Sequence, residues 1–340
     1  MRDLVVAGGG PIGLATALYA ARAGMDVEVR EPRPAPVDKA CGEGLMPGAV
    51  AGLAALGVDP PGHRLAGIRY VGGGRSADAL FRHGEGRGVR RTTLHRSLTE
   101  AVAEAGIKVV ERAVSEVESR AGHVLVDGEP AGYLVAADGL HSPVRRMLGL
   151  DRPVEGRRRF GLRVHVEMEP WTPFVEVHWA EGSEAYVTPV ADELVGIALL
   201  TERHAAFEDL LAEHVLLRQR LGRRPLSRTR GAGPLRQRSA ARTIGRVLLV
   251  GDAAGYLDAL TGEGIAIGLA QARAAVDAVV AGRPEDYEAA YRRLGRRHEL
   301  LTHALLVSSR VPVVRRQIVP LAARLPRVFT GVVDQLARPA

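Results

Sequence analysis

The sequence of 340 residues is 46% hydrophobic and 25% charged, a composition typical of a soluble globular protein long enough for two domains. Its formal net charge of +7 comes almost entirely from arginines spread along the chain, and no motif interleaves aromatic with basic residues, which excludes a nucleic-acid-binding protein. The 11 histidines offer no pair at helical ligand spacing with an acid or a thiol, so we expect no metal site.

The first element is an apolar strand over residues 1–7. Gly8, Gly10 and Gly13 follow it at a spacing that turns a strand into a helix whose free N–H groups face a pyrophosphate. Pro11 suits the first helical position, where its missing N–H has no intrahelical partner to lose. These residues predict a phosphate-binding turn.

A helix of small apolar residues is expected over 12–23, with Gly24 as its C-cap. The next strand, 26–30, alternates polar with apolar residues and delivers Glu31 at its end. A carboxylate at this distance from the first glycine accepts the ribose hydroxyls of an adenosine. Strand, glycines, helix, strand and acid in this order predict a dinucleotide-binding unit.

Two later apolar strands end in an acid beside a glycine. The first ends in Asp138-Gly139, and the second ends in Gly251-Asp252 and leads into a helix of small residues that extends to about residue 281. Taken singly, a Gly-Asp pair can be only a helix cap and an Asp-Gly pair only a turn. In one chain with the glycine-rich turn, they reinforce the cofactor interpretation.

These three segments resemble the glycine-rich, Asp-Gly and Gly-Asp motifs of the flavoprotein monooxygenases typified by para-hydroxybenzoate hydroxylase, and of the related geranylgeranyl reductase family. The resemblance covers most of the chain. It implies an α/β fold with a Rossmann-like FAD-binding domain of three layers (ββα), an inserted, mostly antiparallel β substrate domain and C-terminal helices. It also implies FAD as the cofactor. Because no second GxGxxG is present, NADH or NADPH would bind only transiently as the electron donor.

The resemblance further implies which residues contact FAD: Gly8, Gly10, Pro11, Gly13, Glu31, Cys41, Gly42, Arg91, Val114, Asp138, Gly139, Gly251, Asp252, Gly262, Gly264 and Ile265. Asp252 would hold the ribityl chain, and the helix that opens at Gly262 would point its positive end at the flavin pyrimidine. Arg91 would begin a helix and reach the cofactor. Val114, in the strand after that helix, would contact the adenine through its backbone. Asp138 would support both FAD and the nicotinamide donor.

Cys41 lies in a segment where neighbouring glycines indicate a backbone that closely approaches another group. In geranylgeranyl reductases a Cys-Gly pair at this position lies against the isoalloxazine ring. Cys41 is therefore a candidate catalytic residue that could tune or protonate the cofactor or the substrate. The alternative is that Cys41 is a small buried hydrophobic residue.

The motifs are scattered, so the expected domains are discontinuous. The FAD-binding domain is assigned to residues 1–66, 89–152 and 238–284. The substrate-covering β-sheet domain is assigned to residues 67–88 and 153–237. Residues 285–340 are expected to form a C-terminal helical region. Alternating or apolar runs predict four strands in the β domain: 161–167, 174–179, 184–188 and 194–200.

Helices complete the expected elements. One is predicted over 207–221, ended by Gly222. The C-terminal region should consist of helices broken at Pro312, Pro320 and Pro326.

The strand 184–188 is a candidate wall of the substrate pocket. Tyr186 and Thr188 share one face of this strand, so both point at the flavin if either does. Pro189 follows as a third candidate lining residue, and Tyr186 is the second catalytic candidate. The alternative is an ordinary strand whose tyrosine is buried with its hydroxyl satisfied.

Three functions remain open on this scaffold. The first, which is the function that we expect from the sequence, is an NAD(P)H-dependent monooxygenase that hydroxylates an aromatic or polyketide-like small molecule, and the other two are alternatives. The second is a reductase that saturates an isoprenoid or other alkene, which the sequence Gly262-Glu263-Gly264 and the alanine at 259 favour over the hydroxylase pattern. The third is a non-enzymatic flavin carrier. Trp171 and Trp179 do not form the paired-tryptophan motif of flavin-dependent halogenases, which argues against halogenation.

The expected location is the cytoplasm. A single cysteine excludes an internal disulfide, the first strand leaves no room for a signal peptide, and no run of about eighteen apolar residues could span a bilayer. The expected partner is a hydrophobic or aromatic small molecule. Residues 310–340 mix arginines with bulky apolar residues, so they either pack on the FAD domain or make weak contact with an anionic membrane surface.

Overall fold

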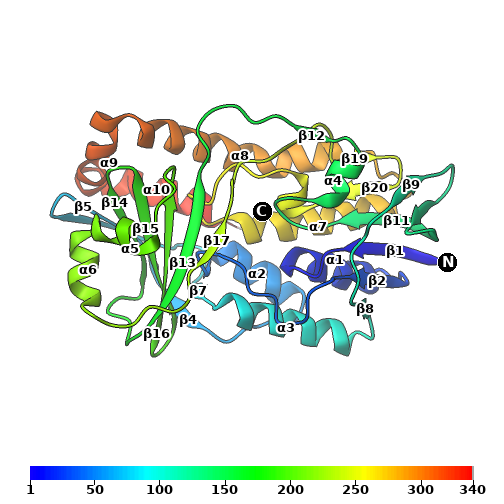
Figure 1. The fold of residues 1–340 in the computed structure, drawn as a ribbon, viewed down its shortest axis with the longest axis horizontal. Coiled ribbons are helices and arrows are strands. Elements are labelled where there is room, and N and C mark those ends of the chain that lie inside the picture. Colours follow the sequence, from blue (N-terminus) through cyan, green and yellow to red (C-terminus); the bar gives the residue numbers. More distant parts are fainter. Residues whose placement is uncertain (339–340) are drawn as a thin grey trace.

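Two large sheets occupy opposite ends of the molecule, and the long helix α8 (Asp286–Arg310) runs along both of them (Figure 1). The computed structural model describes residues 1–338. The sheet that carries the N-terminus has a parallel centre, and the other sheet is almost entirely antiparallel. This is the expected α/β fold with a Rossmann-like FAD domain, a β domain and C-terminal helices.

The first sheet has the strand order β19-β20-β11-β1-β2-β8, and the hairpin of β9 and β10 pairs with β11. Its strands are β1 (Arg2–Ala7), β2 (Val27–Arg30), β8 (Lys108–Val110), β9 (Val117–Ser119), β10 (Val124–Val126), β11 (Glu129–Ala136), β19 (Thr243–Ile244) and β20 (Val247–Leu249). The helices of this part are α1 (Pro11–Arg22), α2 (Pro47–Ala55), α3 (Arg91–Glu104), α4 (Pro143–Met147), α7 (Gly264–Val280) and the short 3-10 helix η1 (Gly251–Ala254).

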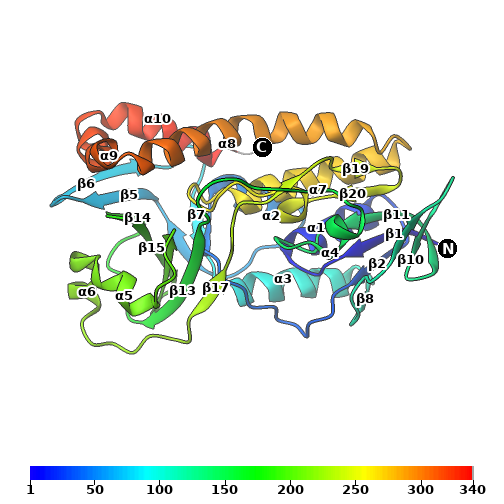
Figure 2. The same cartoon turned by 45° about the horizontal axis from the view of Figure 1, so that its top comes forward.

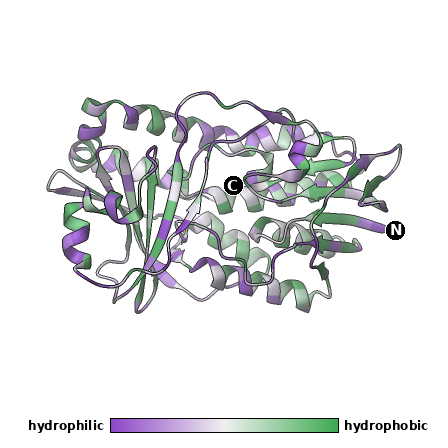
Figure 3. Cartoon of the chain, in the orientation of Figure 1, coloured by the Kyte–Doolittle hydropathy of each residue, from purple (hydrophilic) through white to green (hydrophobic). Residues whose placement is uncertain are grey.

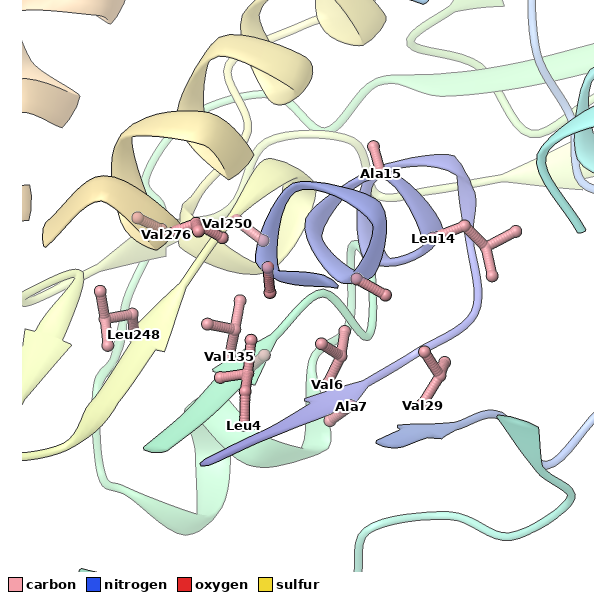
Figure 4. Close-up of a cluster of buried hydrophobic side chains, with 14 of the residues drawn as sticks. Leu4, Val6, Ala7, Leu14, Ala15, Val29, Val135, Leu248, Val250 and Val276 are labelled. Atoms are coloured by element: carbon pink, nitrogen blue, oxygen red, sulfur yellow. The ribbon is translucent and has the colours of Figure 1, made fainter. Parts of the chain in front are cut away.

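The core of the first sheet explains why its central strands are continuous apolar runs. Leu4 and Val6 of β1 cluster with Val135 of β11 beneath α1 (Figure 4), and all three are fully buried. Strands covered on both faces carry no polar alternation, as is usual for parallel sheets. The hydropathy colouring in Figure 3 shows the same apolar interior along β1 and β11. Burial on both faces therefore holds β1 and β11 in place.

The second sheet has the strand order β17-β13-β16-β15-β14-β5-β6, with β14 and β5 as its one parallel pair among the described residues. Its strands are β5 (Gly67–Gly72), β6 (Arg75–Leu80), β13 (Phe160–Glu167), β14 (Phe174–Ala180), β15 (Ser183–Ala191), β16 (Leu194–Thr201) and β17 (Arg230–Ala232). All four strands predicted for this region are confirmed. One face of the sheet packs on α5 (Phe207–Ala212) and α6 (Val215–Leu221).

Two smaller sheets join the parts. One is the three-stranded sheet of β3 (Gly44–Leu45), β7 (Gly86–Gly88) and β4 (His63–Leu65), and the other pairs β12 (Asp151–Arg152) with β18 (Arg238–Ser239). The first joins segments 1–66 and 67–88, which the sequence assigned to different domains. This sheet ties the Cys41 segment to the β domain.

The C-terminal region forms α8, α9 (Pro312–Arg324) and α10 (Pro326–Ala337), so the breaks predicted at Pro312 and Pro326 are confirmed. Figure 2 shows α9 and α10 above β5 and β6, at the end of the molecule away from the N-terminus. Within residues 1–338, no helix combines the length and the apolar run needed to cross a bilayer.

Two predicted helices are wrong in detail. The helix expected over 207–221 is two helices, because His214 between them has a non-helical ψ of 66°. The His214 side chain is buried there and shares a hydrogen bond with the Ser183 hydroxyl. Pro320 does not break the C-terminal region but lies inside α9. Its ring removes one internal hydrogen bond, and the packing of α9 on the sheet maintains the helix.

Candidate functional site

The carboxyl ends of three parallel strands bring the predicted motifs together. Gly8 follows β1, Asp138 follows β11 and Gly251-Asp252 follow β20. Because parallel strands end at the same edge of a sheet, these residues converge although they are far apart in sequence. Of these residues, Asp138, Gly251 and Asp252 line a cavity of about 1010 Å³ that extends between the second sheet and helices α8 to α10.

Most of the predicted site residues line this cavity. Those that do are Gly10, Pro11, Cys41, Gly42, Arg91, Asp138, Gly139, Tyr186, Thr188, Gly251, Asp252, Gly262, Gly264 and Ile265. Those that do not are Gly8, Gly13, Glu31, Val114 and Pro189.

The glycines of the turn have two different geometries. A Cβ on Gly13 would overlap the carbonyl oxygen of Gly8, and a Cβ on Gly8, whose φ is +101°, would lie 2.5 Å from the carbonyl oxygen of Ala137. A Cβ on Gly10 would meet only the tip of Arg91, at 4.0 Å. Gly8 and Gly13 therefore permit close backbone packing, whereas Gly10 leaves open space at the start of α1.

Glu31 is buried behind this turn. Its carboxylate accepts hydrogen bonds from the Gly9 N–H at 2.9 Å and from the Arg33 guanidinium at 2.7 and 2.9 Å. Burial alone would raise the pKa of Glu31, but these hydrogen bonds outweigh it and the pKa is lowered. Arg33 lines the cavity and is half-exposed, so its side chain can move aside and release the carboxylate.

His95 supports the same turn and was missed by the sequence analysis. It lies one helical turn after Arg91 on α3, and its Nε2 donates to the Gly9 carbonyl at 2.9 Å. Burial lowers the pKa of His95 and outweighs this hydrogen bond, which by itself would raise it. The signal available in the sequence was that His95 follows Arg91 by four residues, a spacing that puts both side chains on one face of the helix.

Asp138 has one bonded and one free carboxylate oxygen. Oδ2 accepts from the Val144 N–H at 3.0 Å, and Oδ1 is buried with no hydrogen-bond partner among the described residues. Burial raises the pKa of this carboxyl, against the hydrogen bonds that lower it. An unpartnered oxygen at the cavity wall is suited to a ligand donor.

Asp252 lies on η1, with about a third of its side chain exposed, and Lys39 Nζ is 3.4 Å from its Oδ2. The buried Arg145 holds the same turn, because its Nη1 donates to the Ala253 carbonyl at 2.9 Å. Helix α7 begins at Gly264, and its positive N-terminal end faces the cavity. These contacts place an acid and a helix terminus side by side.

The Cys41 segment is anchored by a buried carboxylate that sequence reasoning did not single out. Glu43 has a φ of +59°, and its carboxylate accepts from the Arg91 N–H at 2.8 Å and from His165 Nε2 at 2.7 Å. Arg163 can only donate to Nδ1 of His165, so the ring proton must lie on Nε2. Glu43 thus joins this segment to α3 and β13.

The Cys41 thiol lies next to the backbone of Glu43. Cys41 Sγ accepts from the Glu43 N–H at 3.4 Å and lines the cavity, and a Cβ on Gly42 would meet nothing within 4 Å. The Thr188 hydroxyl donates to the Gly42 carbonyl at 2.8 Å. The segment therefore presents an open, flat surface to the cavity.

Tyr186 and Thr188 both line the cavity, as the strand period requires. The Tyr186 hydroxyl donates to the Leu260 carbonyl at 2.9 Å, and burial raises the pKa of this phenol well above its usual value. Pro189 points to the opposite side of β15, where its carbonyl lies so close to Gly88 that a Cβ there would overlap it. The placement of Pro189 in the pocket is wrong.

The strand assignment of Val114 is wrong, whereas its backbone contact with the adenine stays a prediction. Strand β8 ends at Val110, so Val114 lies in the loop that follows. Its side chain is buried in the core of the first sheet and does not line the cavity.

No described cluster of histidine, cysteine and acidic side chains in residues 1–338 is arranged to hold a metal ion.

The far end of the cavity is apolar. Helices α8, α9 and α10 contribute aliphatic side chains and one ring, among them Leu301, Leu305, Ile318, Leu321, Ala322 and Phe329. The sheet contributes Ile68, Val175 and Val177 from the opposite side. The cavity thus has a polar end at the glycine-rich turn and an apolar end under the C-terminal helices.

The polar end fits a flavin dinucleotide on three observations. Gly10 leaves open space in front of the helix N–H groups, and a Cβ on Gly42 would meet nothing within 4 Å. The Nε of Arg91 and Oδ1 of Asp138 are buried without a hydrogen-bond partner in residues 1–338. These are the positions that a pyrophosphate and a planar ring need.

Comparison with known proteins defines the class. The sequence profile of the FAD binding domain family matches residues 1–281, and the chain belongs to this family of FAD-dependent oxidoreductases. It is 31% identical over 329 residues to a menaquinone reductase of Mycolicibacterium smegmatis, covering 87% of this chain and 80% of that protein.

A digeranylgeranylglycerophospholipid reductase of Methanothermobacter thermautotrophicus is 28% identical over 300 residues, covering 78% of this chain and 74% of that protein. Among solved structures, the flavin-dependent halogenase CmlS superposes with a TM-score of 0.80 at 21% identity. That match covers 90% of this chain and 64% of the halogenase, and it supports the fold alone.

Proposed function

We propose that this protein uses FAD to saturate a carbon–carbon double bond of an isoprenoid lipid. The observation that carries the proposal is the two-ended cavity, in which an aliphatic chamber under α8 to α10 continues from the polar end that fits FAD. An elongated apolar chain fits that chamber, since apolar walls favour burial of a hydrocarbon. The relatives named as reductases of a menaquinone and of a digeranylgeranyl phospholipid support the same substrate class.

The chain's residues divide the work between binding and protonation. Gly10, Arg91 and Asp252 would hold the dinucleotide, and Glu31 would take the adenosine ribose once Arg33 moves aside. Once reduced by NADH or NADPH, the proposed electron donor, bound FAD would supply hydride to one alkene carbon.

The second alkene carbon needs a proton, and the two catalytic candidates differ in their ability to give one. The Tyr186 hydroxyl already donates to the Leu260 carbonyl, and burial raises its pKa well above the usual value, which makes it a weak acid. The Cys41 thiol lines the cavity beside the open face of Gly42. Cys41 is therefore the proton donor that we propose.

A second candidate function is hydroxylation of an aromatic or polyketide-like molecule by the same cofactor with oxygen. The observation in its favour is that three tyrosines, Tyr70, Tyr186 and Tyr256, line the cavity and offer ring faces to an aromatic substrate. The size of the chamber argues against a flavin carrier without a substrate.

Anaerobic reoxidation of the reduced flavin separates these functions. The FAD-loaded protein is reduced with NADPH or dithionite and mixed, without oxygen, with menaquinone or a geranylgeranyl lipid. We expect reoxidation and, after any quinol has been oxidised back to the quinone in air, a product that is still two mass units heavier. Reoxidation should be slowed in Cys41→Ala and less so in Cys41→Ser, which keeps a weaker acid. Reoxidation only by oxygen, with a hydroxylated phenolic product, would support the second candidate instead.

A further inference from the structure

Four apolar residues of α9, of α10 and of the junction between them, where Leu325 lies, are exposed and also line the cavity. Leu321, Leu325, Val328 and Val332 have exposed fractions of 47, 52, 60 and 41%, and each contributes to the cavity wall. A side chain can do both only where the cavity reaches the surface. These four residues are called the apolar opening below.

The apolar opening lies on α9, on α10 and at their junction, at the end of the molecule away from the N-terminus. Figure 2 shows α9 and α10 at the outer edge of the structure, above β5 and β6. Two further valines of α9, Val313 and Val314, are 72 and 40% exposed. Several exposed bulky apolar side chains on adjacent helices are unusual for a surface that faces only water.

Positive charge surrounds this surface. Residues 310–338 contain six arginines and one acidic residue, Asp334. Arg316, Arg324 and Arg327 are exposed, and none of them forms an ion pair with any residue in 1–338. Unpaired arginines beside exposed aliphatic side chains complement an anionic lipid surface.

We propose that α9 and α10 dock on an anionic lipid bilayer and that a lipid substrate enters the cavity through the apolar opening. The aliphatic side chains would lie at the boundary of the acyl chains, and the three arginines would lie among the phosphate headgroups. A hydrocarbon chain then passes from the bilayer to the chamber without crossing water, which avoids the cost of hydrating it. The identity of the lipid substrate rests on the proposed function, whereas the docking does not.

The test uses the full-length FAD-loaded protein with vesicles. Cosedimentation is measured at low and high salt with phosphatidylglycerol vesicles and with phosphatidylcholine vesicles. We expect binding to phosphatidylglycerol that is weakened by salt and is much weaker on phosphatidylcholine. The triple variant Arg316→Gln/Arg324→Gln/Arg327→Gln should bind roughly ten- to hundredfold more weakly, since each arginine near the surface contributes to the attraction.

Two further variants separate charge from apolar contact. The double variant Leu325→Asn/Val328→Asn should also weaken vesicle binding, because the polar asparagine side chains would not insert among the acyl chains. The matched controls are Arg158→Gln/Arg223→Gln/Arg228→Gln and Val215→Asn/Leu216→Asn, which change equally exposed residues of the β domain. Both controls should bind vesicles as the wild type does.

Three outcomes would overturn the docking proposal. They are no cosedimentation with phosphatidylglycerol at low salt, equal binding by the opening variants and the wild type, and a dimer in solution that the Leu325→Asn/Val328→Asn variant dissociates without any vesicle binding. Vesicle binding without turnover of any isoprenoid would instead contradict the proposed function and leave the docking intact. Where turnover occurs, the arginine triple variant, whose residues do not line the cavity, should lose it on vesicle-embedded substrate and keep it on detergent-solubilised substrate.

Discussion

The polar and the apolar ends of the cavity are built from different kinds of contact. At the polar end, Gly8 and Gly13 bring backbone atoms so close that no side chain fits, and His95 holds the turn with a hydrogen bond. At the apolar end, aliphatic side chains from α9 and α10 form a wall. These side chains are partly exposed, and other aliphatic residues could replace them. Backbone packing tolerates no substitution, whereas an aliphatic wall tolerates many. The difference predicts where mutations abolish folding, where they abolish cofactor binding and where they change only the substrate.

The largest effect is expected at Gly13. The Gly13→Ala substitution would put a Cβ on the carbonyl oxygen of Gly8, and strand β1 cannot move because it is buried on both faces. We expect a loss of about 3 kcal/mol or more in the free energy of unfolding. Urea unfolding followed by circular dichroism measures it, with Gly331→Ala as the control because a Cβ there meets nothing within 4 Å. A variant as stable as the wild type would show that the turn is looser than the structure indicates.

Gly10 should separate cofactor binding from folding. A valine there extends into the space in front of the α1 N-terminus, so the Gly10→Val protein should fold but bind FAD at least about a hundredfold more weakly, equivalent to about 2.8 kcal/mol. Flavin absorbance per chain after purification and dialysis measures the retained FAD. Full retention by a folded variant would contradict the assignment of the polar end to the pyrophosphate.

Glu43 should give a smaller effect, divided between stability and the flavin environment. Two donors, the Arg91 N–H and His165 Nε2–H, share its carboxylate, and the amide of Glu43→Gln has only one acceptor oxygen for them. One buried donor is then unsatisfied, at a cost of about 2 kcal/mol. We expect a lower free energy of unfolding and a shifted flavin absorbance maximum, with the exposed Glu208→Gln as the control. An unchanged flavin spectrum would mean that the Cys41 segment does not depend on this anchor.

An effect that is absent at neutral pH and develops only in acid is expected in the β domain. Burial lowers the pKa of His214 to about 4, whereas an unfolded histidine titrates near 6.5. Its contribution to stability is therefore complete above pH 6.5 and is lost as the pH falls from 6.5 toward 4, by roughly 1 kcal/mol per pH unit. Acid unfolding followed by fluorescence of Trp171 and Trp179 should be less steep in His214→Gln, and the exposed His303→Gln should not change it. Equal slopes for all three proteins would remove His214 as the cause.

The residues of the polar end could be predicted from the sequence because the patterns that identify them extend over only a few neighbouring residues. Glycine spacing, the strand ends at Asp138 and Asp252, and the start of α3 at Arg91 follow from steric limits within a few residues. The β domain shows the limit of such rules. The break at His214 depends on its buried contact with Ser183, and the orientation of Pro189 depends on Gly88, both brought together only by tertiary packing. Glu43 and His165 are likewise 122 residues apart, so no local pattern pairs them.

The apolar end was less predictable for a different reason. Residues 310–340 show an arginine-rich amphipathic composition, from which either packing on the FAD domain or membrane contact was expected. The structure places α9 and α10 mainly against β5 and β6, so packing on the FAD domain is not the main contact of these two helices. Residues 339–340 lie outside the described part of the chain.

The central claim is that FAD and the lipid substrate occupy the two ends of one cavity, and filling the apolar end tests it most directly. Ala322 lines the cavity on α9, whereas its neighbour Ala323 is exposed and does not. Titration of the FAD-loaded protein with menaquinone, followed by flavin difference absorbance, should give a saturable change in the wild type and in Ala323→Phe. The account predicts that Ala322→Phe keeps one FAD per chain but needs at least about tenfold more menaquinone, equivalent to about 1.4 kcal/mol. An unchanged titration by Ala322→Phe, or its loss of FAD and response together, would contradict the account.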